Sequence, residues 1–484
     1  MIEEASEINH RRSHRSLIWI AAETGTNAIL LLGTMLLMAR LIGPTALGAA
    51  ALATGIILLV NIFVEYLFHD ALILREKIDD DIFNQSFFIV QTIAFSLTLV
   101  ALLLPLIVPE DIAHLAWLGF GAACSLPFSG ALGIANARLR RAFRYQDVAR
   151  ASIGGRIGGA LIGLLAAFLG YGAWSLVAQF TSSVAVNCLA IYVAMEWRPK
   201  FRMTGGVEHL LRYALPNAAM NLLIAMRLQG FLIVSATLLG VTEVGFINAG
   251  FRIVNTPQAI LSNALASFLL PLLSHSRQSF AAFKSNIRLG NRVALTATIP
   301  IFAGLVVTAD DLVPLVLGKD WVPTIQVVQI LALGSLASAA RFPSSLILRS
   351  QGIVKYSFYN ALFQLIATLG AALIFRPATT MGASLCWTAP IAVPLAITIW
   401  IVRRETNLSV RDQLDGFTSV LLATLGMMAI VVGSTTTFAL NDSFSRLCFH
   451  IGLGAIAFPI LLIAIDATTR QYLSARLRRL TVGR

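Results

Sequence analysis

The chain contains fourteen apolar segments, each about long enough to cross a membrane as a helix. A hydrocarbon core about 30 Å thick needs about 20 apolar helical residues. The segments are centred near residues 28, 57, 96, 123, 161, 184, 226, 257, 298, 335, 365, 392, 427 and 457. They use most of the 484 residues, so only short connections remain and no soluble catalytic domain fits. The sequence therefore predicts an all-α integral membrane protein with about fourteen transmembrane helices.

Basic residues fall almost entirely in alternate loops between these segments. If both termini are cytoplasmic, 28 of the 36 lysines and arginines lie in cytoplasmic connections and four lie in outer ones. Lys and Arg in short loops orient membrane proteins in this way. One misplaced segment would invert every later loop and remove the asymmetry. The pattern therefore supports both the number of spans and cytoplasmic termini.

The net charge of +12 does not indicate a nucleic-acid partner, because of where the charges lie. The arginine-rich loop at 138–145 and the tail at 476–479 are on the expected cytoplasmic face. Basic clusters in this position typically meet anionic lipid headgroups. We expect anionic membrane lipids as partners and no nucleic acid.

A short internal repeat indicates a duplication. Residues 41–48 and 238–245 both read Leu-x-Gly-x-Thr-x-x-Gly, 197 residues apart, each in an outer turn between two spans. Two six-span blocks that start on the same side are parallel repeats, related by a pseudo-two-fold axis along the membrane normal. We divide the chain into an N-lobe (1–203), a C-lobe (204–405) and a final part (406–484) with spans thirteen and fourteen and a basic cytoplasmic tail. The polar stretch 196–206 is the expected linker or hinge between the lobes.

Small residues predict close helix packing in the fifth segment, where glycine recurs at 154, 155, 158, 159 and 163. This spacing lets two helix backbones approach each other. We expect the contact inside one lobe rather than between two copies of the chain. In the eighth segment, Pro257 and Pro271 are expected to interrupt and bend the helix.

Several polar residues are expected to have no chemical role. The four cysteines, at 124, 188, 386 and 448, lack the close pairing of a metal site and are interpreted as small buried hydrophobes. The acidic runs at 79–81 and 310–311 are expected to be solvated. The sequence has no nucleotide-binding loop, zinc-protease motif or nucleophile elbow. We therefore expect no enzyme activity, catalytic residue, metal or cofactor.

Four stretches carry a family resemblance: 39–48, its copy at 239–246, 318–324 (Gly-Lys-Asp-Trp-Val-Pro-Thr) and 329–333 (Gln-Ile-Leu-Ala-Leu). Together they resemble the polysaccharide transporter (oligosaccharide flippase) family, within the multidrug/oligosaccharidyl-lipid/polysaccharide exporter superfamily. The resemblance covers nearly the whole chain. One departure is the stretch 65–70 (Glu-Tyr-Leu-Phe-His-Asp), where relatives often have a small residue or glycine. That departure leaves the identity of the glycan open.

The resemblance implies a transporter of the bacterial inner membrane. Such a protein moves undecaprenyl-diphosphate-linked oligosaccharide repeat units from the cytoplasmic to the outer leaflet, for exopolysaccharide or lipopolysaccharide assembly. Its expected mechanism is alternating access, with two lobes rocking about a cationic central cavity. The polysaccharide polymerase and export machinery are expected partners.

Three arginines within predicted spans, Arg227, Arg252 and Arg341, are the candidate substrate-binding residues. An ionisable residue at membrane depth is costly and by default faces protein or a watery cavity. Guanidinium binds phosphate through a planar fork of donors. Alternatively, each arginine pairs with a carboxylate or a helix-end carbonyl, or snorkels to the interface. Arg156, near the start of its span, is expected to be interfacial.

Four residues near the first two spans are candidates for ion coupling: Glu23, Glu65, His69 and Asp70. A buried carboxylate could exchange a proton, bind sodium or pair with an arginine. A structural hydrogen bond between helices is the simpler alternative. His69 titrates in the physiological range.

Two other functions compete with the flippase. An ion-coupled drug or metabolite antiporter of the same superfamily is favoured by twelve spans rather than fourteen. A glycan polymerase or ligase would need a large outer loop with catalytic groups, and the outer loops here are short.

Overall fold

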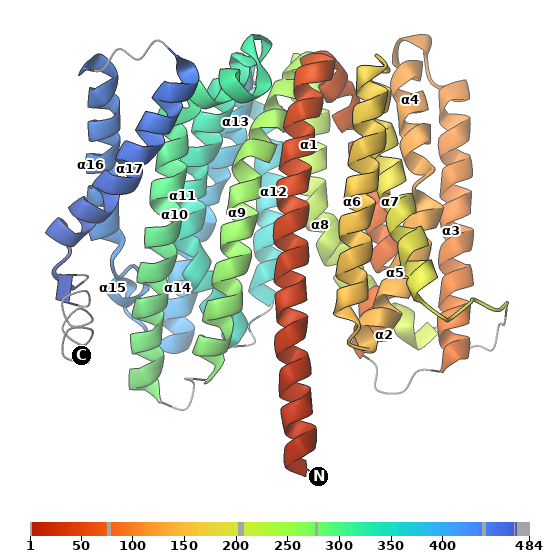
Figure 1. Cartoon of the computed structure of the whole chain (residues 1–484), viewed down its shortest axis with the longest axis horizontal. Helices are drawn as coiled ribbons and strands as arrows, with labels where there is room; N and C mark the ends of the chain where they lie inside the picture. The colour runs from red at the N-terminus through yellow and green to blue at the C-terminus, as the bar shows by residue number, and fades with distance from the viewer. Residues whose placement is uncertain are drawn as a thin grey trace. The chain divides into compact units, whose positions relative to one another are not determined.

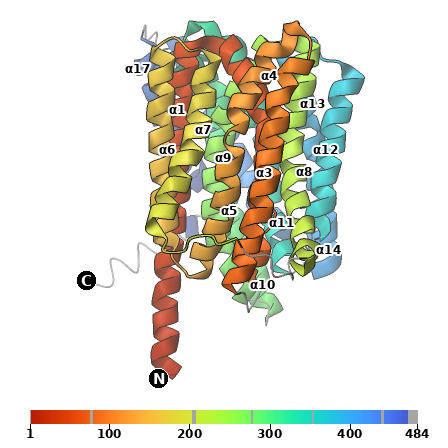
Figure 2. The same ribbon diagram turned by 90° about the vertical axis from the view of Figure 1, so that its right-hand side faces the viewer.

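The computed structural model describes residues 2–74, 79–201, 208–275, 279–351, 353, 355–437, 442–468 and 470–471. Every regular element in these residues is helical (Figures 1 and 2). The chain forms two compact units, Met1–Asn248 and Ala249–Arg484. The predicted lobe boundaries at 203 and 405 stay predictions.

The helices of the first unit pack around an apolar core of α1, α3, α4, α5 and α7. In chain order they are α1 (Ile2–Tyr66), α2 (His69–Leu74), α3 (Asp80–Ile107), α4 (Glu110–Ala123), α5 (Leu126–Arg141), α6 (Tyr145–Phe168), α7 (Ala173–Ala194), α8 (Glu208–Leu239) and the start of α9 (Val241–His275).

The second unit contains the rest of α9 and the helices that follow it. These are α10 (Phe280–Leu317), η2 (Lys319–Trp321), α11 (Pro323–Ser350), α12 (Lys355–Phe375), α13 (Thr380–Thr388), η3 (Ala389–Ile391), α14 (Ala392–Thr406), α15 (Val410–Gln413), α16 (Phe417–Thr437) and α17 (Ser443–Ile465). One apolar cluster joins α9, α10, α11 and α14, and another attaches α16 and α17 to α10 and α11.

The number of crossings agrees with the sequence. Twelve helical stretches are long and apolar enough to span a membrane, and the first of them, Glu23–Ile73, has 51 residues. This stretch breaks at Gly43, which has φ 77° and ψ 173°, so it contains two spans. α9 has 35 residues and is also long enough, since a helix rises about 1.5 Å per residue. The prediction of about fourteen transmembrane helices is confirmed.

The α6–α7 pair confirms the predicted glycine contact and places it inside the first unit. A Cβ added at Gly155 or Gly159 would lie 2.7 Å from the backbone carbonyl oxygen of Ser183 or Gln179. Gly163 continues the same face, where an added Cβ would meet the Gln179 Cβ at 2.5 Å. Three successive turns of α6 therefore lie against α7 at a distance that only glycine permits.

The predicted hinge at 196–206 is attached to the first unit in its first half. Trp197 is buried against the rings of Phe83 and Phe87, with centroids 6.3 and 6.1 Å away. The Arg138 guanidinium lies 5.2 Å from the Trp197 ring. The backbone N–H of Lys200 donates to Asn84 Oδ1 at 3.1 Å. Residues 202–206 of the predicted hinge, like the tail at 476–479, lie outside the described residues.

The interruption expected in the eighth span is absent, while the expected bend stays a prediction. α9 continues as one helix from Val241 to His275, through both Pro257 and Pro271. Proline removes one helical hydrogen bond, but neighbouring groups can satisfy the freed carbonyl inside a bundle. The break in this region lies at Gly240 instead, which has φ 107°.

A buried carboxylate connects α10 to the short helix α15 in the second unit. Asp412 Oδ2 lies 2.8 Å from Lys284 Nζ, and Asp412 Oδ1 accepts from Arg288. The Ser409 hydroxyl donates to Asp412 Oδ2 at 2.7 Å. Burial alone would raise the pKa of Asp412, but these hydrogen bonds and charges outweigh it and hold the pKa well below its usual range. Next to it, Arg292 pairs with Asp415 and Asp466.

Replacing Asp412 is expected to destabilise the second unit. Because the pKa of Asp412 is depressed in the folded protein, its stabilisation is complete above pH about 4 and is lost only as pH falls below that value. Asp412→Asn removes the charge at every pH and should cost about 2 kcal/mol, visible as a lower Tm in detergent at pH 7. Asp80→Asn is the matched control: its pair with Arg138 is exposed and should contribute less than about 1 kcal/mol. Equal losses for both variants would contradict this assignment.

Candidate functional site

Arg341 is a partly buried cation without a counter-ion. It lies in α11, two residues before Pro343, and its Nε is buried with no hydrogen-bond partner. No carboxylate among the described residues pairs with it; the groups that act on its charge are Tyr356 and, more weakly, Arg349, which is another cation. A buried charge without a partner is strongly unfavourable. Such a group marks a place where an anion from outside the protein would be stabilised.

Tyr356 of α12 places a hydroxyl beside this guanidinium and hydrogen-bonds with it. The same hydroxyl lies 2.5 Å from Thr398 Oγ1 and 3.2 Å from the Pro394 carbonyl oxygen, both in α14. Helix α14 therefore fixes the tyrosine, and the tyrosine orients Arg341. The Nε of Arg341 stays buried without a hydrogen-bond partner among the described residues in this arrangement.

The other two predicted arginines have interactions of their own. Arg227 is partly buried in α8 of the first unit, and Arg252 is partly buried in α9 of the second. Both side chains interact with other residues. Of the three predicted arginines, Arg341 therefore shows the clearest sign of a ligand site.

The structure brings the four predicted coupling residues into one electrostatic neighbourhood of the first unit. The charges of Glu65, Asp70 and Glu23 all act on the Tyr66 hydroxyl at the end of α1. His69 begins α2, and its Nδ1 lies 2.9 Å from Asp70 Oδ1. The His69 and Tyr66 rings meet edge to face at 5.3 Å.

Arg140 of α5 completes this cluster, and the sequence did not single it out. Its charge acts on Glu65, Tyr66 and His69, yet its Nε is buried without a hydrogen-bond partner. Glu65 forms no ion pair with any described residue. α5 approaches closely here because Gly133 has no side chain: an added Cβ would lie 2.2 Å from the Glu65 carbonyl oxygen. Glu65 is thus a carboxylate near a cation but not bound to it.

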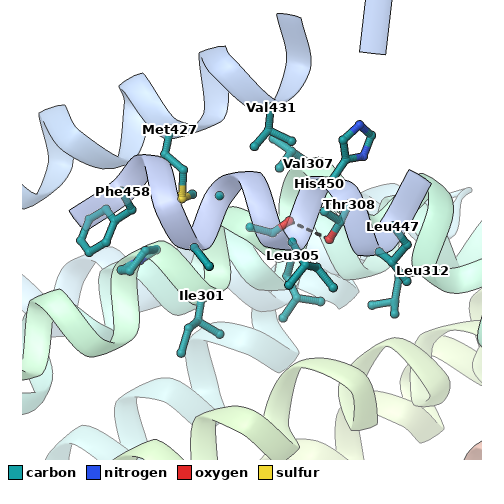
Figure 3. A pocket seen from close by; sticks show the side chains of 15 residues that line it. Ile301, Leu305, Val307, Thr308, Leu312, Met427, Val431, Leu447, His450 and Phe458 are labelled. Carbon is teal, nitrogen blue, oxygen red and sulfur yellow. Dashed lines mark hydrogen bonds between the residues drawn. The ribbon is translucent and has the colours of Figure 1, made fainter. Parts of the chain in front are cut away.

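The second unit contains an apolar cavity of about 390 Å³ between α10, α16 and α17 (Figure 3). Its wall includes Ile301 and Leu305 from α10, Met427 from α16 and Phe458 from α17. The hydroxyl of Thr308, which also lines it, is already used, since it donates to the Gly304 carbonyl oxygen at 2.8 Å. The cavity suits a saturated or isoprenoid chain better than a polar solute.

An ion pair and a buried histidine lie at one end of this cavity. Asp311 Oδ1 lies 2.6 Å from Arg446 Nε, and Asp311 Oδ2 lies 3.3 Å from Nδ1 of the buried His450. The expectation of a solvated run at 310–311 was therefore wrong for Asp311, which is 7% exposed. The three side chains connect α10 with the first two turns of α17.

The interfacial position expected for Arg156 stays a prediction. It is partly buried in α6 and has no hydrogen bond or ion pair with any described residue. One turn earlier, Ser152 accepts a hydrogen bond from Asn27 of α1 at 2.8 Å. Ser152 and Arg156 share a helix face. The sequence feature that could have pointed to this helix contact is an arginine inside the glycine-rich stretch of the fifth segment.

Comparison with known sequences identifies relatives along the whole chain. The profile of a family described as polysaccharide biosynthesis protein matches residues 37–326. The succinoglycan biosynthesis transport protein ExoT of Rhizobium meliloti (strain 1021) is 22% identical over 468 residues, 95% of this chain and 94% of that protein. The teichuronic acid biosynthesis protein TuaB of Bacillus subtilis (strain 168) is 20% identical over 297 residues, 60% of this chain and 61% of that protein.

Solved structures show the same fold. The lipid II flippase MurJ in an inward closed conformation has a TM-score of 0.80 at 16% identity, over 92% of this chain and 98% of that one. An inward-facing multidrug resistance MATE family transporter has a TM-score of 0.55 at 14% identity, over 80% of this chain and 94% of that one. The predicted all-α transporter fold is confirmed.

Filling the cavity is expected to stabilise the protein. At Gly304 an added Cβ would meet nothing within 4 Å, so Gly304→Leu can place its side chain in the cavity. The variant should gain about 1 kcal/mol from helix propensity and further packing energy from the filled space. Gly370→Leu in α12, where a Cβ also meets nothing within 4 Å, is the control for propensity alone. A higher Tm for Gly304→Leu than for Gly370→Leu is expected, and equal values would contradict the empty cavity.

Proposed function

Because the chain belongs to the polysaccharide biosynthesis protein family, we propose that it is a flippase for lipid-linked oligosaccharide. Its cargo is an undecaprenyl-diphosphate-linked repeat unit, moved from the cytoplasmic to the outer leaflet of the bacterial inner membrane for exopolysaccharide or lipopolysaccharide assembly. The likeness to ExoT over nearly the whole chain and the MurJ-like fold support a carrier of this kind.

Arg341 is the observation that carries the proposal. A diphosphate is a compact anion, and a buried guanidinium with an unused N–H is a strong partner for it. Before cargo binds, the uncompensated charge of Arg341 raises the free energy of the empty carrier. Binding of the diphosphate removes that cost, so headgroup binding is favoured at membrane depth. In this proposal Arg227 and Arg252 contribute further positive charge along the path.

The Glu65 cluster supplies the proposed energy coupling. Glu65 is held near Arg140 without an ion pair, so protonation breaks no existing contact. A proton on Glu65 leaves the Arg140 charge uncompensated, and its release restores the attraction between α1 and α5. Glu23, His69 and Asp70 belong to the same electrostatic group. The sequence contains no ATP-binding loop, which leaves an ion gradient, the membrane potential or consumption of the product as the energy source; the Glu65 cluster favours the ion gradient.

The cavity between α10, α16 and α17 is the proposed resting place of the lipid tail. The tail stays in apolar surroundings while the diphosphate and glycan cross in the polar passage.

An ion-coupled drug or metabolite antiporter is the second candidate, favoured by the fold of the MATE transporter. That structure covers 80% of this chain against 92% for the flippase, and fourteen spans favour the flippase over the antiporter.

Substitution of Arg341 tests the binding role. Arg341→Ala is expected to lower polysaccharide export about tenfold, the effect of losing one charge-assisted contact of roughly 1.5 kcal/mol. Export is measured in a gene-deletion strain complemented with each variant, together with the accumulated lipid-linked intermediate. Arg341→Lys keeps the charge but loses the planar fork, so an intermediate loss is expected. Arg411→Ala, at an exposed arginine of the same unit, is the control.

Three results bear on this prediction. Accumulation of the cytoplasmic intermediate with normal membrane abundance of Arg341→Ala is the expected one. Full export by a well-expressed Arg341→Ala protein would overturn the binding role. Normal surface polysaccharide in the deletion strain itself would overturn the proposed function.

Glu65→Gln tests the coupling role. Glutamine keeps the shape of the side chain but carries no exchangeable carboxyl proton, so transport into vesicles should no longer respond to an imposed pH gradient. Uptake without a gradient should persist. Asp79→Asn, an exposed carboxylate before α3, should respond as the native protein does. An unchanged gradient response in Glu65→Gln would assign coupling elsewhere.

A further inference from the structure

Arg156 lies halfway along α6 and faces the interior of the first unit. It is the twelfth of the 24 residues of this helix, so it lies about 16 Å from the helix start. Ala149 and Gly163, each two turns away on the same side of α6, are buried. Leu161 and Leu165, on the other side of the helix, are exposed. The arginine is therefore directed towards the neighbouring helices and away from the outer surface of the bundle.

The guanidinium of Arg156 has unused hydrogen-bond donors. The side chain is partly buried and makes no hydrogen bond or ion pair with any described residue. A guanidinium stays charged at physiological pH, and it has five N–H donors and no acceptor. A charge kept inside a bundle without a partner is unfavourable unless an anion from outside the protein neutralises it. Arg341 shows this property in the second unit, and Arg156 shows it in the first.

Two buried acceptors lie beside the same stretch of α6, where α1, α6 and α7 contact one another (Figures 1 and 2). Asn27 of α1 donates to Ser152, one turn before Arg156, at 2.8 Å. Asn187 of α7 packs against the residue before Arg156, since a Cβ added at Gly155 would lie 2.6 Å from the Asn187 Cβ. Both asparagines have a buried Oδ1 that accepts no hydrogen bond from any described residue. Each of the three helices thus brings unused hydrogen-bonding capacity to one level of the bundle.

The combination of an unused cation with unused acceptors limits the chemistry of a ligand. A diphosphate offers acceptor oxygens, so it suits Arg156 but leaves both amide oxygens unpaired. A neutral sugar offers hydroxyl donors to the amides but no charge to the arginine. A sugar that carries a carboxylate offers both, because its carboxylate accepts from the guanidinium and its hydroxyl groups donate to the amide oxygens. The arrangement therefore fits an acidic sugar better than a diphosphate or a neutral sugar.

We propose that Arg156, Asn27 and Asn187, here called the acid site, bind a carboxylate-bearing sugar of the cargo, such as a uronic acid. The proposal rests on the proposed function, because it takes the cargo to be a lipid-linked oligosaccharide. It assigns that cargo to a class, the acidic repeat units. It also assigns separate contacts to the glycan, in the first unit, and to the diphosphate, at Arg341 of the second unit. In this proposal Arg156 lies within the membrane, the alternative to the interfacial position expected from the sequence.

Binding of two matched lipids to the purified full-length protein tests the acid site. Undecaprenyl-diphosphate-glucuronic acid and undecaprenyl-diphosphate-glucose differ only in the carboxylate of the sugar. The native protein should bind the glucuronic acid lipid about tenfold more tightly, the effect of one charge-assisted contact. Arg156→Gln should bind both lipids about equally, and Arg156→Lys should keep part of the preference. Arg150→Gln, at an exposed arginine of the same helix, is the control and should keep the native preference.

Arg341→Ala separates this inference from the proposed function. It should weaken the binding of both lipids to the same extent and leave the preference for the acid unchanged. Equal affinity of the native protein for the two lipids, or an unchanged preference in Arg156→Gln, overturns the acid site and leaves the flippase standing. Binding of neither lipid more tightly than undecaprenol, which has no diphosphate and no sugar, overturns the proposed function together with the acid site.

The empty acid site also predicts a difference in stability that needs no cargo. Arg156→Met replaces an uncompensated charge with an apolar side chain, so it should raise the Tm in detergent. Asn27→Asp introduces a carboxylate beside Ser152, where it can pair with Arg156, so it should raise the Tm and abolish the preference for the acidic lipid. Arg150→Met, at an exposed position, should change the Tm little. A lower Tm for Arg156→Met would mean that the arginine holds helices together, which contradicts the acid site.

Discussion

An ionised side chain inside hydrocarbon is costly unless a partner or a ligand neutralises it, and this constraint separates the charges of the protein into two kinds. Asp311 is neutralised by Arg446, and Arg292 by Asp415 and Asp466, so these charges hold helices together. Arg341 has no such partner among the described residues. A charge retained without a counter-ion lowers stability, which is explained when an anionic cargo supplies the missing charge.

Glycine controls the second property that transport requires, the distance between helices. Along α6 it permits an extended buried contact that keeps the first unit intact. In the repeat it brings the backbones at Gly48 and Gly245 against those at Val241 and Pro44. The same residue type therefore sets the spacing between helices at two places in the first unit.

The sequence predicted the features that depend on local pattern. Span length, the glycine stripe of α6 and the repeat around Thr45 and Thr242 all follow from spacing, and the structure has each of them. It did not predict pairs distant in the chain. Asp311 and Arg446 are 135 residues apart, so a solvated acidic run and a loop arginine were the natural interpretation. Cys448 is exposed rather than buried because it lies on the outer face of α17. Arg140 was missed because it belongs to a basic run that was expected to meet lipid headgroups, whereas Arg138 and Arg141 of the same run are partly buried as well.

Binding of undecaprenyl diphosphate to the purified protein tests the central claim most directly. The affinity of the native chain should exceed that for undecaprenol, which lacks the diphosphate, and Arg341→Ala should bind the two lipids about equally. Relative to the native chain, Arg341→Ala should lose about tenfold in affinity for undecaprenyl diphosphate and should keep its affinity for undecaprenol. Equal affinity of the native protein for both lipids, or unchanged diphosphate binding in Arg341→Ala, would contradict the account.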